Sequence, residues 1–268
     1  MNSPGEVCRQ YRDGAHLAAR QDLYRRFGVA VTGWQNFVFD LLRLPSRARI
    51  LEVGCGRGDL WVDNRSRLPG GWEVTLSDLS PGMVQETRER LGAGSQFHLV
   101  VAELGSLPFR AASFDGVIAN HMLYHLADLD VGLSDRHRVL ARSGLLIAAT
   151  NGPHHLGQLD QLAARLGPPV GPRSHPRTAF DLVTGPERIR PWFGQLTVAR
   201  HPEEIRVTDP EPLIAYLRSL PGPRLGARRA SAARRFLGAE IERRGFWGIG
   251  VDAGVIRGRR RARPLRSA

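Results

Sequence analysis

The chain has 268 residues, of which 42% are hydrophobic and 24% charged, and its formal net charge is +12. This balance predicts a packed globular fold rather than general disorder, and no apolar run approaches the roughly 20 residues of a membrane span. Two cysteines, Cys8 and Cys55, are too few for a disulfide scaffold or a cysteine zinc site. Because the first residues lack the apolar stretch of a signal peptide, we expect a soluble, cytoplasmic protein.

The positive charge is concentrated near the C-terminus. All 38 basic side chains are arginine; residues 1–220 carry a net charge of +2, whereas residues 221–268 carry +10. A nucleic-acid surface spread over the main domain is therefore not implied. Residues 258–268 have no apolar periodicity, so we expect a basic disordered tail. Binding of nucleic-acid phosphates by Arg259 to Arg261 remains an alternative to a simple solvated extension.

The first part of the chain predicts helices followed by a parallel sheet. Residues 1–45 should form a helical N-terminal cap, broken at Gly28 and Gly33 and ended by Pro45. In residues 46–150, short apolar runs then alternate with glycine turns or polar helical stretches. These runs are Arg49–Val53, Trp72–Leu76, Phe97–Val101, Phe114–Ala119 and Leu145–Thr150. Such alternation is typical of a parallel sheet that helices cover on both faces.

The remaining residues should complete the fold around this core. Residues 151–220 are expected to form a lid on the substrate side, with a strand at 196–201 and a helix at 212–220. Residues 221–257 should add a basic helix at 224–244. Two closing strand segments are then expected, separated by a turn at Asp252–Ala253–Gly254.

A glycine-rich loop is the strongest single motif. The segment LEVGCGRGDL, Leu51 to Leu60, follows an apolar strand and precedes a predicted helix, which is the setting of a cofactor loop. Its glycines are spaced G-x-G-x-G, not G-x-G-x-x-G as in a dinucleotide loop. Glu52 and Asp59 flank them, and a pyrophosphate would disfavour such carboxylates. S-adenosylmethionine (SAM), which carries a sulfonium and an ammonium group, suits the loop better.

A second carboxylate follows the next predicted strand. Asp78 lies 20 residues beyond Gly58, where a carboxylate can accept hydrogen bonds from both hydroxyls of a ribose. Ser80 and Pro81 then predict the N-cap and first turn of a helix.

Several segments, in this order, resemble the class I SAM-dependent methyltransferases, specifically the UbiE-like, or methyltransferase type 11, small-molecule branch. LEVGCGRG is similar to the first motif of that family and SDLSPGM to its second. Three further stretches are similar to later family segments: VAELGSLPF (101–109), SFDGVIANHMLYHLAD (113–128) and HRVLARSGLLIAAT (137–150). The resemblance is close over residues 46–150. Glu103 replaces a family aspartate, and Arg142-Ser143-Gly144 replaces Pro-Gly-Gly.

The resemblance implies a Rossmann-like α/β fold with seven strands, mostly parallel, and helices on both faces. It implies SAM as cofactor and S-adenosylhomocysteine as product. The implied cofactor-binding residues are Glu52, Gly54, Cys55, Gly56, Gly58, Asp78, Leu79, Met83, Glu103, Leu104 and Asn120. Tyr11 and Arg12 could close over the cofactor or form an ordinary helical face.

Two histidines are candidates for a catalytic base. His121 and His155 follow the fourth and fifth predicted strands, at the sheet edge where ligands bind in α/β folds. Because alignment of donor and acceptor can supply about 7–11 kcal/mol, methyl transfer does not require a base. A base typically adds about 10²–10⁴-fold, which matters most for a hydroxyl acceptor. No His, Cys or carboxylate set has metal-ligand spacing, so no metal is predicted.

The predicted function is methyl transfer to an O, N or C atom of a small organic acceptor, in specialised-metabolite biosynthesis. Asn120-His121-Met122-Leu123 replaces the (Asp/Asn)-Pro-Pro-(Tyr/Phe) motif, which argues against methylation of DNA bases. Two alternatives stay open: an RNA-modifying methyltransferase that uses the arginine-rich C-terminus, and a SAM-binding protein with another activity. A membrane partner is not expected, and the sequence leaves homo-oligomerisation open.

Overall fold

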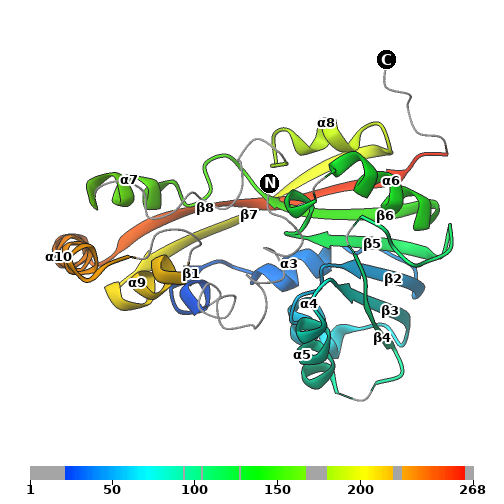
Figure 1. The fold of residues 1–268 in the computed structure, drawn as a ribbon, viewed down its shortest axis with the longest axis horizontal. Coiled ribbons are helices and arrows are strands. Elements are labelled where there is room, and N and C mark those ends of the chain that lie inside the picture. Colours follow the sequence, from blue (N-terminus) through cyan, green and yellow to red (C-terminus); the bar gives the residue numbers. More distant parts are fainter. Residues whose placement is uncertain are drawn as a thin grey trace.

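The computed structural model describes residues 22–92, 94–103, 105–126, 128–166, 180–219 and 225–262. In these residues the strands form one sheet in the order β1-β7-β8-β6-β5-β2-β3-β4 (Figure 1). The predicted Rossmann-like α/β class is confirmed. The predicted count of seven strands is wrong, because the sheet has eight.

The five strands expected in residues 46–150 are all present and parallel to one another. They are β2 (Arg47–Val53), β3 (Gly71–Asp78), β4 (Phe97–Val101), β5 (Phe114–Asn120) and β6 (Leu140–Asn151). The register aligns Ile50 with Val74 on one side and with Gly116 on the other. The carboxyl ends of these strands therefore meet at one edge of the sheet.

Helices cover both faces of this parallel part, as predicted. The helical elements are α3 (Trp34–Asp40), α4 (Asp59–Asp63), η1 (Arg65–Arg67), α5 (Pro81–Leu91), η2 (Leu123–His125), α6 (Leu129–Val139) and α8 (Gly185–Ile189). Successive strand residues enter different hydrophobic clusters: Ile50 packs with Trp61 of α4, whereas Leu51 packs in the cluster that contains Leu133 of α6. Because neighbouring strand residues point to opposite faces, the two clusters lie on opposite sides of the sheet.

Two long antiparallel strands extend the sheet on the other side of β6. β7 (Phe193–Val207) and β8 (Trp247–Arg260) pair from Phe193↔Arg260 to Val207↔Trp247. The pairing of β8 with β6 ends at Asn151↔Ala253. Residues 202–207 and 247–252, here called the β7–β8 arm, therefore continue beyond the carboxyl edge of the parallel strands (Figure 1). The predicted turn at 252–254 is wrong, since β8 passes through it without a break.

A third hydrophobic cluster covers one face of the arm. Ile205, Val207 and Ile249 pack there against α7 (Gly157–Leu166), α9 (Pro210–Ser219) and α10 (Ala227–Arg244). Residues 22–27, which are helical, add Leu23 to the cluster. β1 (Gly28–Val29) then pairs with β7 at Glu204 and Ile205. Residues 151–220 thus do more than cover the sheet, because they supply one of its strands, β7.

The chain end is more ordered than predicted. β8 continues to Arg260, so the expected disorder is wrong for residues 258–260. Arg259 donates to the carbonyl of Ser143 at 3.2 Å, and Arg260 donates to that of His137 at 2.8 Å. Arg261 donates to carbonyls of Arg190 and Phe193. These guanidinium groups stabilise the fold itself.

The rest of the predicted tail, from residue 263, lies outside the described residues, as do Tyr11 and Arg12. Among the helices that are described, none combines the length and apolar character needed to span a bilayer.

Candidate cofactor and acceptor site

Backbone geometry makes the loop between β2 and α4 tight and concave. Gly54, Gly56 and Gly58 have φ values of +72°, +56° and +69°, a left-handed conformation that glycine adopts at little cost. The amides of Gly54 and Cys55 both donate to the carbonyl of Ser77 on β3, at 2.7 and 3.0 Å. The loop is therefore anchored to the neighbouring strand and turns directly into α4.

Gly58 is restricted by space as well as by φ. A Cβ atom at this position would lie 2.7 Å from Cγ2 of Thr87 on α5. The Thr87 hydroxyl donates to the carbonyl of Gly56 at 2.7 Å. The helix that follows β3 thus packs directly on the loop.

Asp78 ends β3 and links the loop to the next helix. Its Oδ2 accepts from the amide of Gly56 and its Oδ1 from the amide of Ser80, each at 2.9 Å. Burial raises the pKa of Asp78, and the hydrogen bonds from backbone amides oppose this effect only in part. Ser80 caps α5 through the amide of Met83, which confirms the predicted N-cap.

Glu52 is a buried carboxylate under the same loop. It is 2% exposed, and its Oε2 accepts from the indole N–H of Trp61 at 2.6 Å. Burial raises its pKa to about 8; the Trp61 hydrogen bond lowers it, and the charges of Asp59 and Asp78 raise it further. Two poorly solvated carboxylates beside a left-handed glycine loop fit a cationic ligand and do not fit a pyrophosphate.

Asp59 does not join this pair. Its carboxylate forms an ion pair with Arg90 of α5, whose guanidinium also donates to the carbonyl of Arg57 at 2.6 Å. The sequence prediction treated Asp59 as a second loop carboxylate available to the ligand. In the structure it helps to attach the loop to α5.

The other predicted cofactor residues lie in varied environments. Cys55 and Met83 are buried, and burial raises the pKa of the Cys55 thiol well above its usual range, so this thiol is a packing group. Leu79 is half-buried, directly after Asp78. Glu103 is exposed and forms an isolated bridge with Ser106. Leu104 lies outside the described residues.

Asn120 ends β5, and His121 follows it directly. Both lie beside Trp34, which belongs to residues 22–40, here called the N-terminal segment. The indole N–H of Trp34 donates to Oδ1 of Asn120 at 3.2 Å, and the rings of Trp34 and His121 have centroids 4.8 Å apart. His121 has a φ of +54° and donates its amide to the carbonyl of Ala149 on β6 at 3.1 Å. This strained turn holds both side chains at the carboxyl edge.

His155, the other predicted base, lies after β6 and has a different neighbour. Its Nε2 is 3.3 Å from the hydroxyl of Tyr24. The structure therefore places His121 and His155 at the ends of adjacent strands, each against an aromatic side chain of residues 22–40. Within the described ranges, no three His, Cys, Asp or Glu side chains gather as a metal site would require.

Sequence reasoning missed a buried histidine and the aromatic residues around it. His201 of β7 is 3% exposed, and its Nε2 lies 2.6 Å from the carbonyl of Thr32. Its ring contacts Phe37 at a centroid distance of 4.9 Å and Trp34 at 5.4 Å. No short-range signal connects residues 32–37 with residue 201. The contact depends on how β7 enters the sheet.

Comparison with known proteins agrees with this geometry. Residues 51–148 match a family model described as a methyltransferase domain. The ubiquinone/menaquinone biosynthesis C-methyltransferase UbiE of Geotalea daltonii is 28% identical over 153 residues, which cover 55% of this chain and 64% of that protein. The malonyl-[acyl-carrier protein] O-methyltransferase of Enterobacter lignolyticus is 32% identical over 155 residues, 56% of this chain and 55% of that protein.

A solved structure extends the likeness in fold to nearly the whole chain. A SAM-dependent methyltransferase of Thermotoga maritima, described as a possible histamine N-methyltransferase, has a TM-score of 0.57 and 16% identity. The match covers 95% of this chain and all of that one. By contrast, the chain spans 64% and 55% of the length of the two relatives above.

The parallel sheet, the left-handed glycine loop and the family match define the class of this region. Residues 51–148 match a methyltransferase domain and are similar to class I SAM-dependent methyltransferases such as UbiE.

Proposed function

We propose that this protein transfers a methyl group from SAM to an O, N or C atom of a small organic acceptor. The observation that carries the proposal is the cradle formed by the three left-handed glycines, Asp78 and Glu52 at the carboxyl ends of β2 and β3. The cradle combines close backbone approach with two carboxylates, as a cationic nucleoside ligand requires.

The residues of the cradle have separate roles in this proposal. Asp78 would accept hydrogen bonds from the ribose hydroxyls while its own position is fixed by Gly56 and Ser80. Glu52, whose pKa is raised to about 8, would face the ammonium end, and the cation would favour its ionised form on binding. When bound, the cofactor supplies an electrophilic methyl group, and the chain contributes alignment and exclusion of water.

The acceptor would lie at the carboxyl ends of β5 and β6. The aromatic rings of Trp34 and Phe37, next to His121 and His201, favour a flat or apolar acceptor over a highly polar one. His121 or His155 would take the proton from a hydroxyl acceptor. The two relatives are named for a C-methylation and an O-methylation, and either outcome suits this proposal. A role in specialised-metabolite biosynthesis forms part of it.

Part of the basic C-terminus that suggested the RNA-modifying alternative is engaged within the fold. Arg259 to Arg261 donate to main-chain carbonyls of the fold. No described feature therefore favours RNA over a small acceptor, and we propose the latter.

Calorimetric titration with SAM and with S-adenosylhomocysteine tests the cofactor. We expect micromolar binding by the wild type and a loss of at least about 30-fold in Asp78→Ala. Asp115→Asn is the matched control. Asp115 pairs with Arg49 near the start of β5, at the end away from the glycine loop, so this variant should bind SAM normally. Absence of binding by the folded wild type would overturn the proposal.

Turnover by single-histidine variants tests the base. With a phenol-type acceptor, loss of the true base should reduce the methylation rate by about 10²–10⁴-fold. The reduction should be smaller at high pH, where the acceptor ionises by itself. Unchanged rates in both His121→Ala and His155→Ala would remove the histidine base and leave alignment as the source of catalysis.

A further inference from the structure

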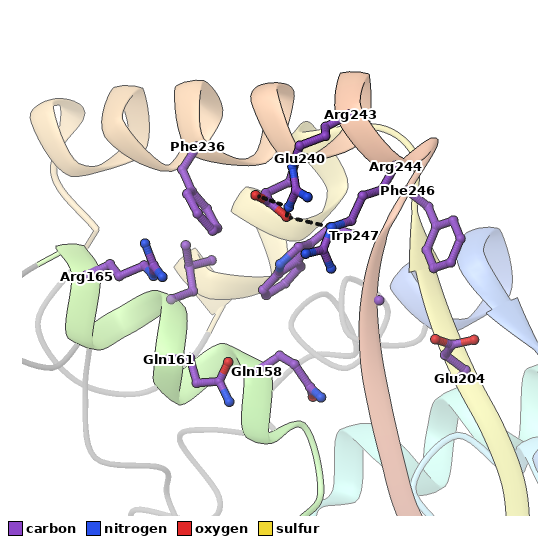
Figure 2. Close-up of a pocket in the computed structure, with 12 residues that line it drawn as sticks. Gln158, Gln161, Arg165, Glu204, Phe236, Glu240, Arg243, Arg244, Phe246 and Trp247 are labelled. Carbon is purple, nitrogen blue, oxygen red and sulfur yellow. Dashed lines mark hydrogen bonds and ion pairs between the residues drawn. The ribbon is translucent and has the colours of Figure 1, made fainter.

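A second pocket lies at the end of the β7–β8 arm. It has a volume of about 680 Å³ and is bounded by α7, α10 and the first residues of β8 (Figure 2). We call it the arm pocket. Arg165 and Gln161 reach it from α7, Phe236 and Glu240 from α10, and Trp247 from β8. Its volume is typical of sites for small organic molecules.

The arm pocket is separate from the cofactor loop. None of its lining residues belongs to the segment 46–150. α7 and α10 lie at one end of the molecule, whereas α4 and α5 lie below the parallel strands at the other (Figure 1). A ligand held there would not occupy the place of SAM.

The charged side chains of the pocket favour an anion. Three guanidinium groups, of Arg165, Arg243 and Arg244, line it together with two carboxylates, Glu204 and Glu240. Glu204 is already paired with Arg206, at 2.8 Å. Arg243 and Arg244 share Glu240, at 2.7 and 3.4 Å. Glu240 also interacts electrostatically with Arg165. One carboxylate therefore serves three guanidiniums, which keep further N–H donors for a ligand.

Arg165 is the guanidinium best placed to bind an external anion. It lies over the ring of Phe236, 5.1 Å from its centroid, and interacts with Glu240 at longer range than Arg243 and Arg244 do. Figure 2 shows Arg165, Phe236 and Glu240 directed into the space between α7 and α10. A guanidinium held flat against a ring can bind a carboxylate, sulfonate or phosphate through two parallel N–H groups.

The aromatic side chains favour a ligand that also carries a flat ring. Phe236 and Trp247 meet edge to face, with ring centroids 6.5 Å apart and planes at 82°. Both are only partly buried, so their faces contribute to the pocket wall. A planar group can lie against such surfaces with little loss of conformational freedom.

The edge of β8 adds main-chain donors and acceptors. Gly250 directs its amide to Oε1 of Gln158 at 3.0 Å and its carbonyl to the amide of Leu156 at 2.9 Å, both away from β7. Gly248 lies two residues earlier in the same uninterrupted register, so its amide and carbonyl face the same edge, inside the pocket. Because β6 stops pairing at Ala253, no described strand covers this part of the edge.

We propose that the arm pocket is a second ligand site, which binds a planar organic anion independently of the cofactor. Arg165 and Arg244 recognise the anionic group, and Phe236 and Trp247 contact the ring. Gly248 offers a main-chain hydrogen bond to a polar substituent. This inference does not rest on the methyltransferase activity, since the site shares no residue with the cofactor loop.

Fluorescence titration of the full chain with 1-anilinonaphthalene-8-sulfonate tests the proposal. N-phenyl-1-naphthylamine, which has the same rings without the sulfonate, is the neutral comparison. We expect the sulfonate probe to bind at least about tenfold more tightly than the neutral one. Arg165→Gln should weaken the sulfonate probe about tenfold and leave the neutral probe unchanged. Arg235→Gln, an exposed arginine of the same α10 outside the pocket, is the control and should have no effect.

A variant that adds a negative charge protects the test against simple unfolding. Gln161 is exposed, so Gln161→Glu should fold normally while it adds negative charge to the pocket wall. It should also weaken the sulfonate probe about tenfold, and saturating SAM should not displace the probe. Any of three results would overturn the proposal: equal affinities of wild type, Arg165→Gln and Gln161→Glu; equal binding of both probes; or displacement by SAM. The titrations contain no cofactor unless it is added, so they are independent of the test of the methyltransferase activity.

Discussion

The glycine loop and the β7–β8 arm both lie at the carboxyl edge of the sheet, but contacts of different range hold them together. In the loop, Gly56 contacts Asp78 and Thr87, 22 and 31 residues away. The arm is connected to the N-terminal segment by the β1–β7 pairing, in which Gly28 faces Ile205 and Val29 faces Glu204, 177 and 175 residues apart. The loop is therefore a product of local turns, and the arm is a product of the completed fold.

This difference matters for function. A site built from neighbouring turns keeps its shape when residues in distant parts of the chain are substituted. This suits the binding of one fixed cofactor. The N-terminal segment contacts His121 through Trp34 and His155 through Tyr24, and the acceptor is proposed to bind there. Changes in long-range packing should then alter the choice of acceptor and leave cofactor binding intact.

The largest expected effect comes from Gly58→Ala in the loop. The added methyl group would need both a left-handed φ and space already filled by Cγ2 of Thr87, 2.7 Å away. We expect a loss of about 2–4 kcal/mol in the free energy of unfolding, from backbone strain and steric overlap together. Thermal or urea unfolding measures it.

Thr87→Ser separates the two causes. Serine removes Cγ2 but keeps the hydroxyl that donates to Gly56. The double variant Gly58→Ala/Thr87→Ser should regain the steric part, roughly half of the loss, and keep the cost of the left-handed backbone. If the double variant regains no stability, Cγ2 of Thr87 does not restrict the space at residue 58.

The glycine loop and the β7–β8 arm also show how much of the structure could be predicted from the sequence. The glycine spacing, Asp78 and the Ser80 cap follow rules that act over a few residues, so the loop and the five parallel strands could be predicted. The uninterrupted β8 could not, because Asp252-Ala253-Gly254 has the composition of a turn and is kept extended by pairing with β7. Likewise, the sequence indicates only that Trp34 is an apolar residue near a predicted helix. Its contact with His121 forms only in the complete fold.

Glu52→Gln should make stability and cofactor binding respond in opposite directions. The pKa of Glu52 is raised from 4.5 to about 8, so the folded protein keeps a proton that the unfolded chain loses. Wild-type stability should therefore fall as pH rises from about 4.5 to 8 and level off above it. At pH 9 we expect the Glu52→Gln variant to be more stable than the wild type by about 2–4 kcal/mol, with little difference at pH 4.

Cofactor affinity should fall in the same variant, because an amide offers no negative charge to a cationic ligand. Unfolding midpoints at pH 4 and pH 9, combined with SAM titration, check both parts. If the stability difference does not change with pH, the pKa of Glu52 is not raised. If Glu52→Gln binds SAM as tightly as the wild type, the charge argument for the cradle fails.

Trp34→Leu tests whether long-range packing controls the acceptor side alone. The variant loses the hydrogen bond to Asn120 and the ring contact with His121. We expect kcat/KM for the acceptor to fall about tenfold and the Kd for SAM to change less than twofold. Trp34→Phe is the matched control, since it keeps a ring but loses the N–H. A weakening of SAM binding by much more than twofold in Trp34→Leu would contradict the separation of the two regions.

The smallest expected effect concerns His201, which fastens the N-terminal segment to β7. Burial lowers the pKa of His201, but the Glu203 carboxylate, 3.4 Å from its Nδ1, and the hydrogen bond with the Thr32 carbonyl outweigh it and raise the pKa overall. A group with a raised folded-state pKa stabilises the fold fully below about pH 6.5, and this contribution disappears as pH rises through the folded-state pKa.

The difference in melting temperature between wild type and His201→Gln should therefore be larger at pH 5.5 than at pH 9, by about 2 °C. Glu203→Gln removes the charged partner and should weaken or reverse this pH dependence, because burial, which lowers the pKa of His201, is then opposed only by the Thr32 hydrogen bond. If the pH dependence survives in Glu203→Gln, the protonated His201 is stabilised by something other than this pair, and the N-terminal segment is not held by a charge-dependent contact.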